Sequence, residues 1–233
     1  APRAGGAAGR HRLSTRPSLA RLRQMPSPAI EAAAAESELI GGALEMAEAA
    51  HAGQNRRGSG GMAYIHHPVA VAELLSAHGF GEQTVAAALL HDVVEDSDAS
   101  VEDVAERFGR PVADLVAALT EDETIEPFER RKGAHRRHVA EVGGDALAIY
   151  AADKLSNIRV LRRSLASEGE AAGEEFEVPL EVKEAAWAAD LEMLGRAAPD
   201  LSFVDDLAAE LAKLRETRAR SSIRSEGPAP PRS

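Results

Sequence analysis

Apolar positions in this chain nowhere alternate with polar positions over the length of a strand. Hydrophobic residues make up 44% of the sequence, enough for a packed core, whereas aromatic residues make up only 3%. Ala dominates the apolar set, and Ala favours helix more than any other residue. The pattern therefore predicts an all-α protein.

Glycine and proline mark the ends of the predicted helices. The first helix runs from about Ile30 to Ala52 and stops at Gly53, before a Gly-rich loop over 53–63. Ser100 and Asp103 predict a capping box at the start of a short helix. We expect the further helices at about 68–78, 82–96, 100–109, 111–120, 128–141, 145–165, 180–196 and 203–218, with an exposed loop over 166–178. This order predicts one bundle of about eight to ten helices.

Both ends of the chain differ in composition from its middle. Residues 1–28 are rich in Ala, Gly, Arg, Ser and Pro, which predicts a disordered leader. Residues 219–233 include a Pro-rich run and are expected to form a disordered tail. The folded domain then spans 29–218. An Arg-rich leader without acids is typical of a bacterial extension and, as the minor alternative, of an organelle transit peptide.

Charge and cysteine content exclude several classes of protein. The net charge is -11, although the first 24 residues carry arginines and no acid. An acidic body argues against nucleic-acid binding, which depends on phosphate contacts. The absence of cysteine excludes disulfides and Cys-based zinc sites, so a metal must be held by His and carboxylates. No apolar run approaches the roughly 20 residues that span a bilayer, and we expect no membrane contact and a cytoplasmic protein.

The segment LLHDVVED brings charged residues to the end of a nearly wholly apolar run. Burying charge without compensation is costly, and metal coordination supplies that compensation. His91 and Asp92 are adjacent, so both can reach one ion from a helix edge. Glu95 and Asp96 lie one turn further on, where a base that activates water would be placed.

Two distant residues strengthen this prediction. His67 comes just before Pro68, and Asp153 lies in the apolar segment IYAADKLSNIR. Alone, His67 is an ordinary residue for a helix start, and Asp153 is an ordinary partner for a neighbouring cation. Together with the HD pair they predict a metal site with two His and two carboxylates, which leaves positions open for water and phosphate oxygens. Such ligands fit manganese, iron or zinc.

Four motifs resemble the hydrolase domain of the Rel/SpoT homologue superfamily, an HD domain. Within it they are most similar to the small alarmone hydrolases, which include the metazoan SpoT homologue. The motifs occur in the family's order, and they are HAGQNRRGSGGMAYIHHP (51–68), ALLHDVVED (88–96), FERRKGAH (128–135) and AADKLSNIR (151–159). The resemblance implies an HD-domain helical bundle.

The resemblance also implies an activity. A member of this family hydrolyses guanosine tetra- and pentaphosphate alarmones at the 3′ position, which yields pyrophosphate with GDP or GTP. It implies Mn²⁺ as the working ion, with another divalent transition metal as the alternative. The residues that it assigns to the metal are His67, His91, Asp92 and Asp153, and those that it assigns to the attacking water are Glu95 and Asp96.

The resemblance further assigns substrate-binding roles. Arg56 would stack on the base, and Arg57 would lie near the phosphates. The remaining candidates are Ser59, Asn157, Lys154, Arg131 and Lys132. Arg131 and Lys132 belong to a basic cluster on the helix expected at 128–141, for which an ordinary helix surface is an equal interpretation.

Several questions stay open at this stage. Ser156 stands where many relatives have His or Tyr, which leaves the substrate preference undecided. One alternative is an HD phosphatase for another nucleotide, such as NADPH, an adenosine alarmone or a nucleoside monophosphate. Another is a non-catalytic domain that only binds a nucleotide or a partner helix. A toxic alarmone synthetase is one functional counterpart that the resemblance admits, and the oligomeric state is undetermined.

Overall fold

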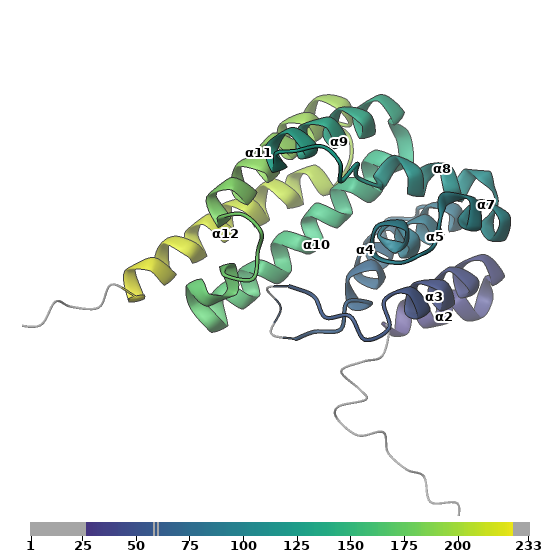
Figure 1. The fold of residues 1–233 in the computed structure, drawn as a ribbon, viewed down its shortest axis with the longest axis horizontal. Coiled ribbons are helices and arrows are strands. Elements are labelled where there is room, and N and C mark those ends of the chain that lie inside the picture. The colour runs from purple at the N-terminus through teal and green to yellow at the C-terminus, as the bar shows by residue number, and fades with distance from the viewer. Residues whose placement is uncertain (1–26, 58, 60, 226–233) are drawn as a thin grey trace, which may run out of the picture.

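The computed structural model describes residues 27–57, 59 and 61–225 (Figure 1). Within these ranges the protein is helical, with one isolated β-bridge between Asn55 and Ala63 and no strand. The all-α prediction is confirmed. The described part holds ten α-helices of eight residues or more, within the expected eight to ten. None of its helices is both long and apolar enough to cross a membrane.

The helices share one pattern, in which short connections join segments of eight to 25 residues, apart from one four-residue turn and one 3₁₀ segment. In chain order they are α2 (Pro28–Glu36), α3 (Glu38–Ala50), α4 (His66–Ala77), α5 (Glu82–Leu90), α6 (Val93–Asp96), α7 (Val101–Phe108), α8 (Arg110–Leu119), α9 (Phe128–Val142), α10 (Gly144–Glu168), η1 (Gly169–Gly173), α11 (Leu180–Ala197) and α12 (Phe203–Ser225).

Ser37 divides the first predicted helix in two. The prediction of one helix over 30–52 is wrong, because Ser37 has an extended backbone with φ −126° and ψ 118°. Its side chain accepts a hydrogen bond from the Ile40 amide at 3.3 Å and donates one to Glu82 at 2.8 Å. Serine competes for backbone groups in this way, which favours caps over helix interiors. Ser37 is thus the N-cap of α3.

The structure agrees more closely with several other predicted helix ends. The capping box of α7 is present, with Ser100 and Asp103 bonded reciprocally. The predicted loop over 166–178 is partly wrong, because α10 continues to Glu168 and η1 follows with Ala172 buried. At the C-terminal end, α12 continues to Ser225, through the first residues of the tail predicted for 219–233. The rest of that tail, and the predicted leader up to residue 26, lie outside the described residues.

The core is built around α10. Figure 1 shows α10 running through the middle of the molecule, with α9, α11 and α12 along one side. It also packs against α4, α5 and α8. Leu155 and Ile158 of α10 are fully buried, and so are Phe203 and Leu207 of α12. Each such side chain contributes roughly 1.5–3 kcal/mol when it is buried, so α10 is the fixed frame on which the surrounding helices are placed.

Candidate metal centre and adjoining pocket

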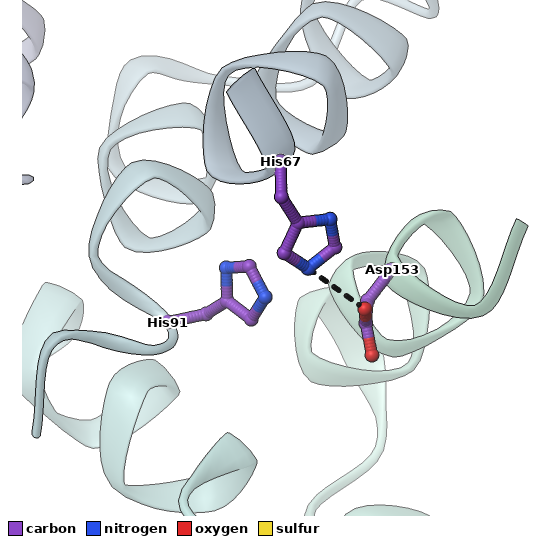
Figure 2. A group of neighbouring side chains, drawn as sticks. All are labelled: His67, His91 and Asp153. Atoms are coloured by element: carbon purple, nitrogen blue, oxygen red, sulfur yellow. Dashed lines mark ion pairs between the residues drawn. The ribbon is translucent and has the colours of Figure 1, made fainter. Parts of the chain in front are cut away.

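The start of α4, the turn after α5 and the middle of α10 bring His67, His91 and Asp153 together (Figure 2). His67 is in the first turn of α4, His91 follows the last residue of α5, and Asp153 lies in the middle of α10. One ligand atom of each lies within 4.8 Å of the others. The three residues are buried, with exposed fractions of 3%, 4% and 8%. Burying ionisable side chains this deeply is costly unless an opposite charge or a metal ion compensates them.

Asp92, the fourth predicted ligand, lies beside these three. Its Oδ1 is 3.2 Å from His91 Nε2, and its Oδ2 is 3.5 Å from His67 Nε2. The Tyr64 hydroxyl donates to Oδ2 at 2.8 Å, a contact that the motif search did not predict. We refer to His67, His91, Asp92 and Asp153 as the His/Asp cluster.

The HD pair lies in a turn between two helices. The prediction of one helix over 82–96 is wrong at this point, since α5 ends at Leu90 and α6 begins at Val93. The Ala88 carbonyl is the acceptor that a continuous helix offers to the Asp92 amide. His91 Nδ1 donates to this oxygen at 2.8 Å, which competes with the helical bond. The turn changes the direction of the backbone just where both side chains enter the cluster.

Hydrogen bonds at the outer ring nitrogens point the inner nitrogens at the cluster. His91 Nδ1 donates to the Ala88 carbonyl, and the buried Nε2 of His91 has no hydrogen-bond partner among the described residues. His67 Nδ1 lies 3.3 Å from Ser156 Oγ, while its Nε2 lies 3.1 Å from Asp153 Oδ1. Metal-bound histidines typically have this arrangement, in which the outer nitrogen is hydrogen-bonded and the inner nitrogen binds the ion. The donor set therefore fits a divalent metal.

Burial and neighbouring charge set the protonation states in the cluster. Burial lowers the pKa of His67 to about 4, so its imidazole is neutral, as a metal ligand must be. Burial opposes ionisation of Asp153, but the Lys154 ammonium and His67 outweigh it and hold the pKa of Asp153 well below its usual range. For Asp92, burial is likewise outweighed by His91 and His67, which lower its pKa.

Glu95 and Asp96 differ in their surroundings. Glu95 is half-buried, and its Oε1 accepts from the Glu121 amide at 2.6 Å. Burial and the Asp92 charge raise the pKa of Glu95 to about 7, which suits a group that accepts a proton near neutrality. Asp96 is exposed, and burial of part of its side chain raises its pKa. Of the two predicted catalytic carboxylates, Glu95 has the environment of a base.

Three of the predicted substrate-binding residues contact Asp153 directly or through one intermediate. Lys154 donates to Asp153 Oδ2 at 2.7 Å, and Asn157 donates to Oδ1. Arg56, which is buried, donates to Asn157 Oδ1 at 2.6 Å. Ser59 instead donates to the Arg56 carbonyl at 2.5 Å, so it stabilises its own loop.

A pocket adjoins the His/Asp cluster on the side of Asp153. Arg57 contributes from the exposed loop, and Lys132 from α9. The pocket also has an apolar wall and one further cation to which the sequence assigned no role, and these residues are Phe128, Phe176, Trp187 and Lys183. The aromatic residues were a usable signal, since the chain has only five Phe and one Trp. Lys183 is the single lysine of α11, and nothing in the sequence around it signalled a role in the pocket.

Arg131 and Lys132 line a neighbouring pocket that shares Arg57 and Lys183 with this one, but both are paired with Glu121. Lys132 Nζ donates to Glu121 Oε1, and Arg131 Nε lies 3.5 Å from Oε2. His135 Nδ1 is 3.3 Å from the same carboxylate. Burial opposes ionisation of Glu121, but His135 and Lys132 outweigh it and lower its pKa. The positive charges of Arg131 and Lys132, which were predicted to bind the substrate, are therefore already compensated within the protein.

Comparisons with known proteins agree with the geometry. The family model described as "HD domain" matches residues 43–178. The chain is 35% identical over 130 residues to guanosine-3′,5′-bis(diphosphate) 3′-pyrophosphohydrolase MESH1 of Xenopus tropicalis, covering 55% of this chain and 72% of that protein. With the MESH1 protein of Homo sapiens it is 36% identical over 124 residues, covering 52% of this chain and 68% of that protein.

Solved structures give the same result. The crystal structure of lmo0812 from Listeria monocytogenes EGD-e matches with a TM-score of 0.59 and 31% identity, over 64% of this chain and 99% of that one. A metazoan orthologue of SpoT, described as hydrolysing ppGpp, matches with a TM-score of 0.53 and 26% identity, over 87% of this chain and 98% of that one. The chain therefore belongs to the HD domain family, whose members bind a divalent metal, and within it to the small alarmone hydrolases.

Proposed function

We propose that the protein is a metal-dependent phosphohydrolase that removes the 3′-pyrophosphate from guanosine tetra- and pentaphosphate. The products are pyrophosphate and GDP or GTP. The observation that carries the proposal is a cation-lined pocket beside the His/Asp cluster, two of whose lining residues, Lys154 and Asn157, donate to Asp153 of the cluster. The MESH1 relatives bear the name of this activity.

The working ion in this proposal is Mn²⁺, held by the four residues of the His/Asp cluster. Imidazole and carboxylate donors suit manganese, and they suit iron or zinc as well. When bound, such an ion polarises phosphate oxygens and lowers the pKa of a water ligand.

The protein's own groups supply the remaining chemistry. Glu95 takes a proton from the attacking water, because its raised pKa and its fixed position against the Glu121 amide suit a general base. The water oxygen forms a bond to the phosphorus attached to the 3′ oxygen, and the bond between that phosphorus and the 3′ oxygen breaks. The 3′ oxygen leaves as a hydroxyl, and the proton that it takes up is the one that Glu95 removed from the water. Arg57 and Lys154 stabilise the charge that develops on the phosphate oxygens.

Product analysis tests the proposal directly. The full chain is incubated with guanosine tetraphosphate and Mn²⁺, and the products are separated by anion-exchange chromatography. GDP and pyrophosphate in equal amounts are expected, and no product should form in the presence of a chelator. An intact tetraphosphate would overturn the proposal.

The same experiment separates the competing functions when it includes NADPH and an adenosine alarmone. Cleavage of one of these, with the tetraphosphate intact, would retain the phosphohydrolase and change its substrate. A protein that binds no divalent ion and cleaves none of them would be a non-catalytic domain. The proposal keeps the bacterial cytoplasm as the compartment and a toxic alarmone synthetase as a counterpart, and both rest on the family resemblance.

A further inference from the structure

Lys183 lies in the pocket next to the His/Asp cluster, on a wall made by α11. It lines this pocket together with Trp187, and it also lines the neighbouring pocket together with Val178. Its ammonium is 4.3 Å from the centre of the Phe176 ring and 5.7 Å from that of Trp187. The cation is thus held between two aromatic rings and faces the same space as Arg56.

The other lysines of the pocket already have carboxylate partners. Lys154 is paired with Asp153, and Lys132 with Glu121. Among the described residues, Lys183 has neither a carboxylate within ion-pair distance nor a hydrogen-bond acceptor, although it is half-buried. Burial, followed by the charges of Lys132 and Lys154, lowers its pKa to about 8.

An ammonium in this position is poorly compensated by the protein alone. Aromatic rings attract a cation, but more weakly than a carboxylate does in a desolvated site. An anion from outside the chain would supply the missing partner. A phosphate group is the natural candidate, because Lys154 and Asn157 line the same pocket and contact Asp153 of the cluster, where another phosphate group is proposed to bind.

We infer that Lys183 binds the phosphate group of the nucleotide that is remote from the cleaved bond, the 5′-diphosphate. The inference rests on the proposed function, since it takes the 3′-diphosphate to lie at the His/Asp cluster. Lys154 and Asn157 mark that end of the pocket, because both contact Asp153. Lys183 comes from α11, a different helix from the one that carries these residues, and among the described residues no ion pair or hydrogen bond joins it to the His/Asp cluster.

Binding measurements test this without any turnover. Calorimetry on the full chain compares GDP, which has the 5′-diphosphate, with guanosine, which lacks it. Lys183→Met should weaken GDP binding by roughly 10–100-fold, the range for a lost charge-assisted hydrogen bond, and leave guanosine binding unchanged. Lys183→Arg should retain most of the GDP affinity. Lys213→Met is the matched control, because Lys213 is on α12 and pairs with Glu210.

A kinetic version uses guanosine tetraphosphate and guanosine 3′-diphosphate with a free 5′-hydroxyl. Lys183→Met should raise KM for the first substrate and leave KM for the second unchanged. Equal effects on GDP and guanosine, or none on GDP, would overturn the inference. If the wild-type chain cleaves neither nucleotide but Lys183→Met still weakens GDP selectively, the proposed function fails and the phosphate site at Lys183 stands.

Discussion

The two histidines of the cluster illustrate how single hydrogen bonds select a ligand atom. His91 donates its Nδ1 proton to the Ala88 carbonyl, and His67 Nδ1 faces Ser156 Oγ. The outer contact of His91 leaves its Nε2 with a free lone pair, and the outer contact of His67 leaves its Nε2 facing Asp153 in the cluster. The contact of His67 depends on one hydroxyl, whereas that of His91 depends on the backbone and cannot be removed by substitution.

Replacement of Ser156 by Ala should therefore weaken metal binding. The imidazole of His67 loses the partner of Nδ1, and loss of such an outer contact typically costs about 10–100-fold in metal affinity or activity. Titration of the metal-free protein with Mn²⁺ measures the affinity. Ser164→Ala is the control, because Ser164 is similarly buried in α10 but belongs to no predicted site. Equal affinities for both variants would contradict a role of Ser156 in orienting His67.

Substitutions of Asp92 and Glu95 should separate metal binding from proton transfer. Asp92→Ala is expected to abolish both bound metal and turnover. Glu95→Ala should retain the metal and lower kcat by about 10²–10⁴, the usual range for a general base. Metal content by mass spectrometry and kcat are measured on the same preparations. Loss of metal from Glu95→Ala would show that Glu95 is a ligand and not the base.

At the residue scale, motifs in the sequence pointed to side chains that the structure places close together. The sequence indicated His91 and Asp153 because charged residues interrupt apolar segments there, and His67 because it precedes Pro68 in a family motif; the structure brings the three together. It did not indicate Tyr64, which contacts Asp92, or Lys183, since neither interrupts such a pattern. Contacts between helices distant in sequence decide these two roles, and local spacing carries no information about them.

Among the elements, α10 links the core to the site. Its buried face packs against α12, while Asp153, Lys154 and Asn157 extend from the same helix toward the cluster and pocket. Periodicity predicted this helix well. It did not predict the breaks at Ser37 and at the HD pair, because both breaks come from a side chain that binds a backbone group, and apolar spacing does not record such bonds.

The packing of α12 on α10 should contribute to stability without affecting metal binding. Leu207→Ala removes a fully buried side chain and is expected to lower the free energy of unfolding by about 2–5 kcal/mol. Urea denaturation measures this change. Glu216→Ala, at an exposed position of the same helix, should change it by less than about 0.5 kcal/mol. A comparable loss in both variants would contradict the described packing.

For the molecule as a whole, a bound ion would join α4, the turn after α5, and α10. A ligand that binds only the folded state at 100 times its Kd stabilises that state by about 2.7 kcal/mol. For a chain of this size, that corresponds to a rise in Tm of about 5–11 °C. Calorimetry with Mn²⁺ and with a chelator measures the shift. Asp153→Ala should show none, and a shift that persists in this variant would place the ion elsewhere.

The distribution of the cluster along the chain also bears on folding kinetics. His67 and His91 are brought together by the neighbouring helices α4 and α5, but Asp153 joins them only when the long segment between His91 and Asp153 has closed. Contacts of high sequence separation form slowly, because loop closure is costly. The arrival of α10 would thus complete the site, so the rate of metal uptake during refolding reports when the central helix docks.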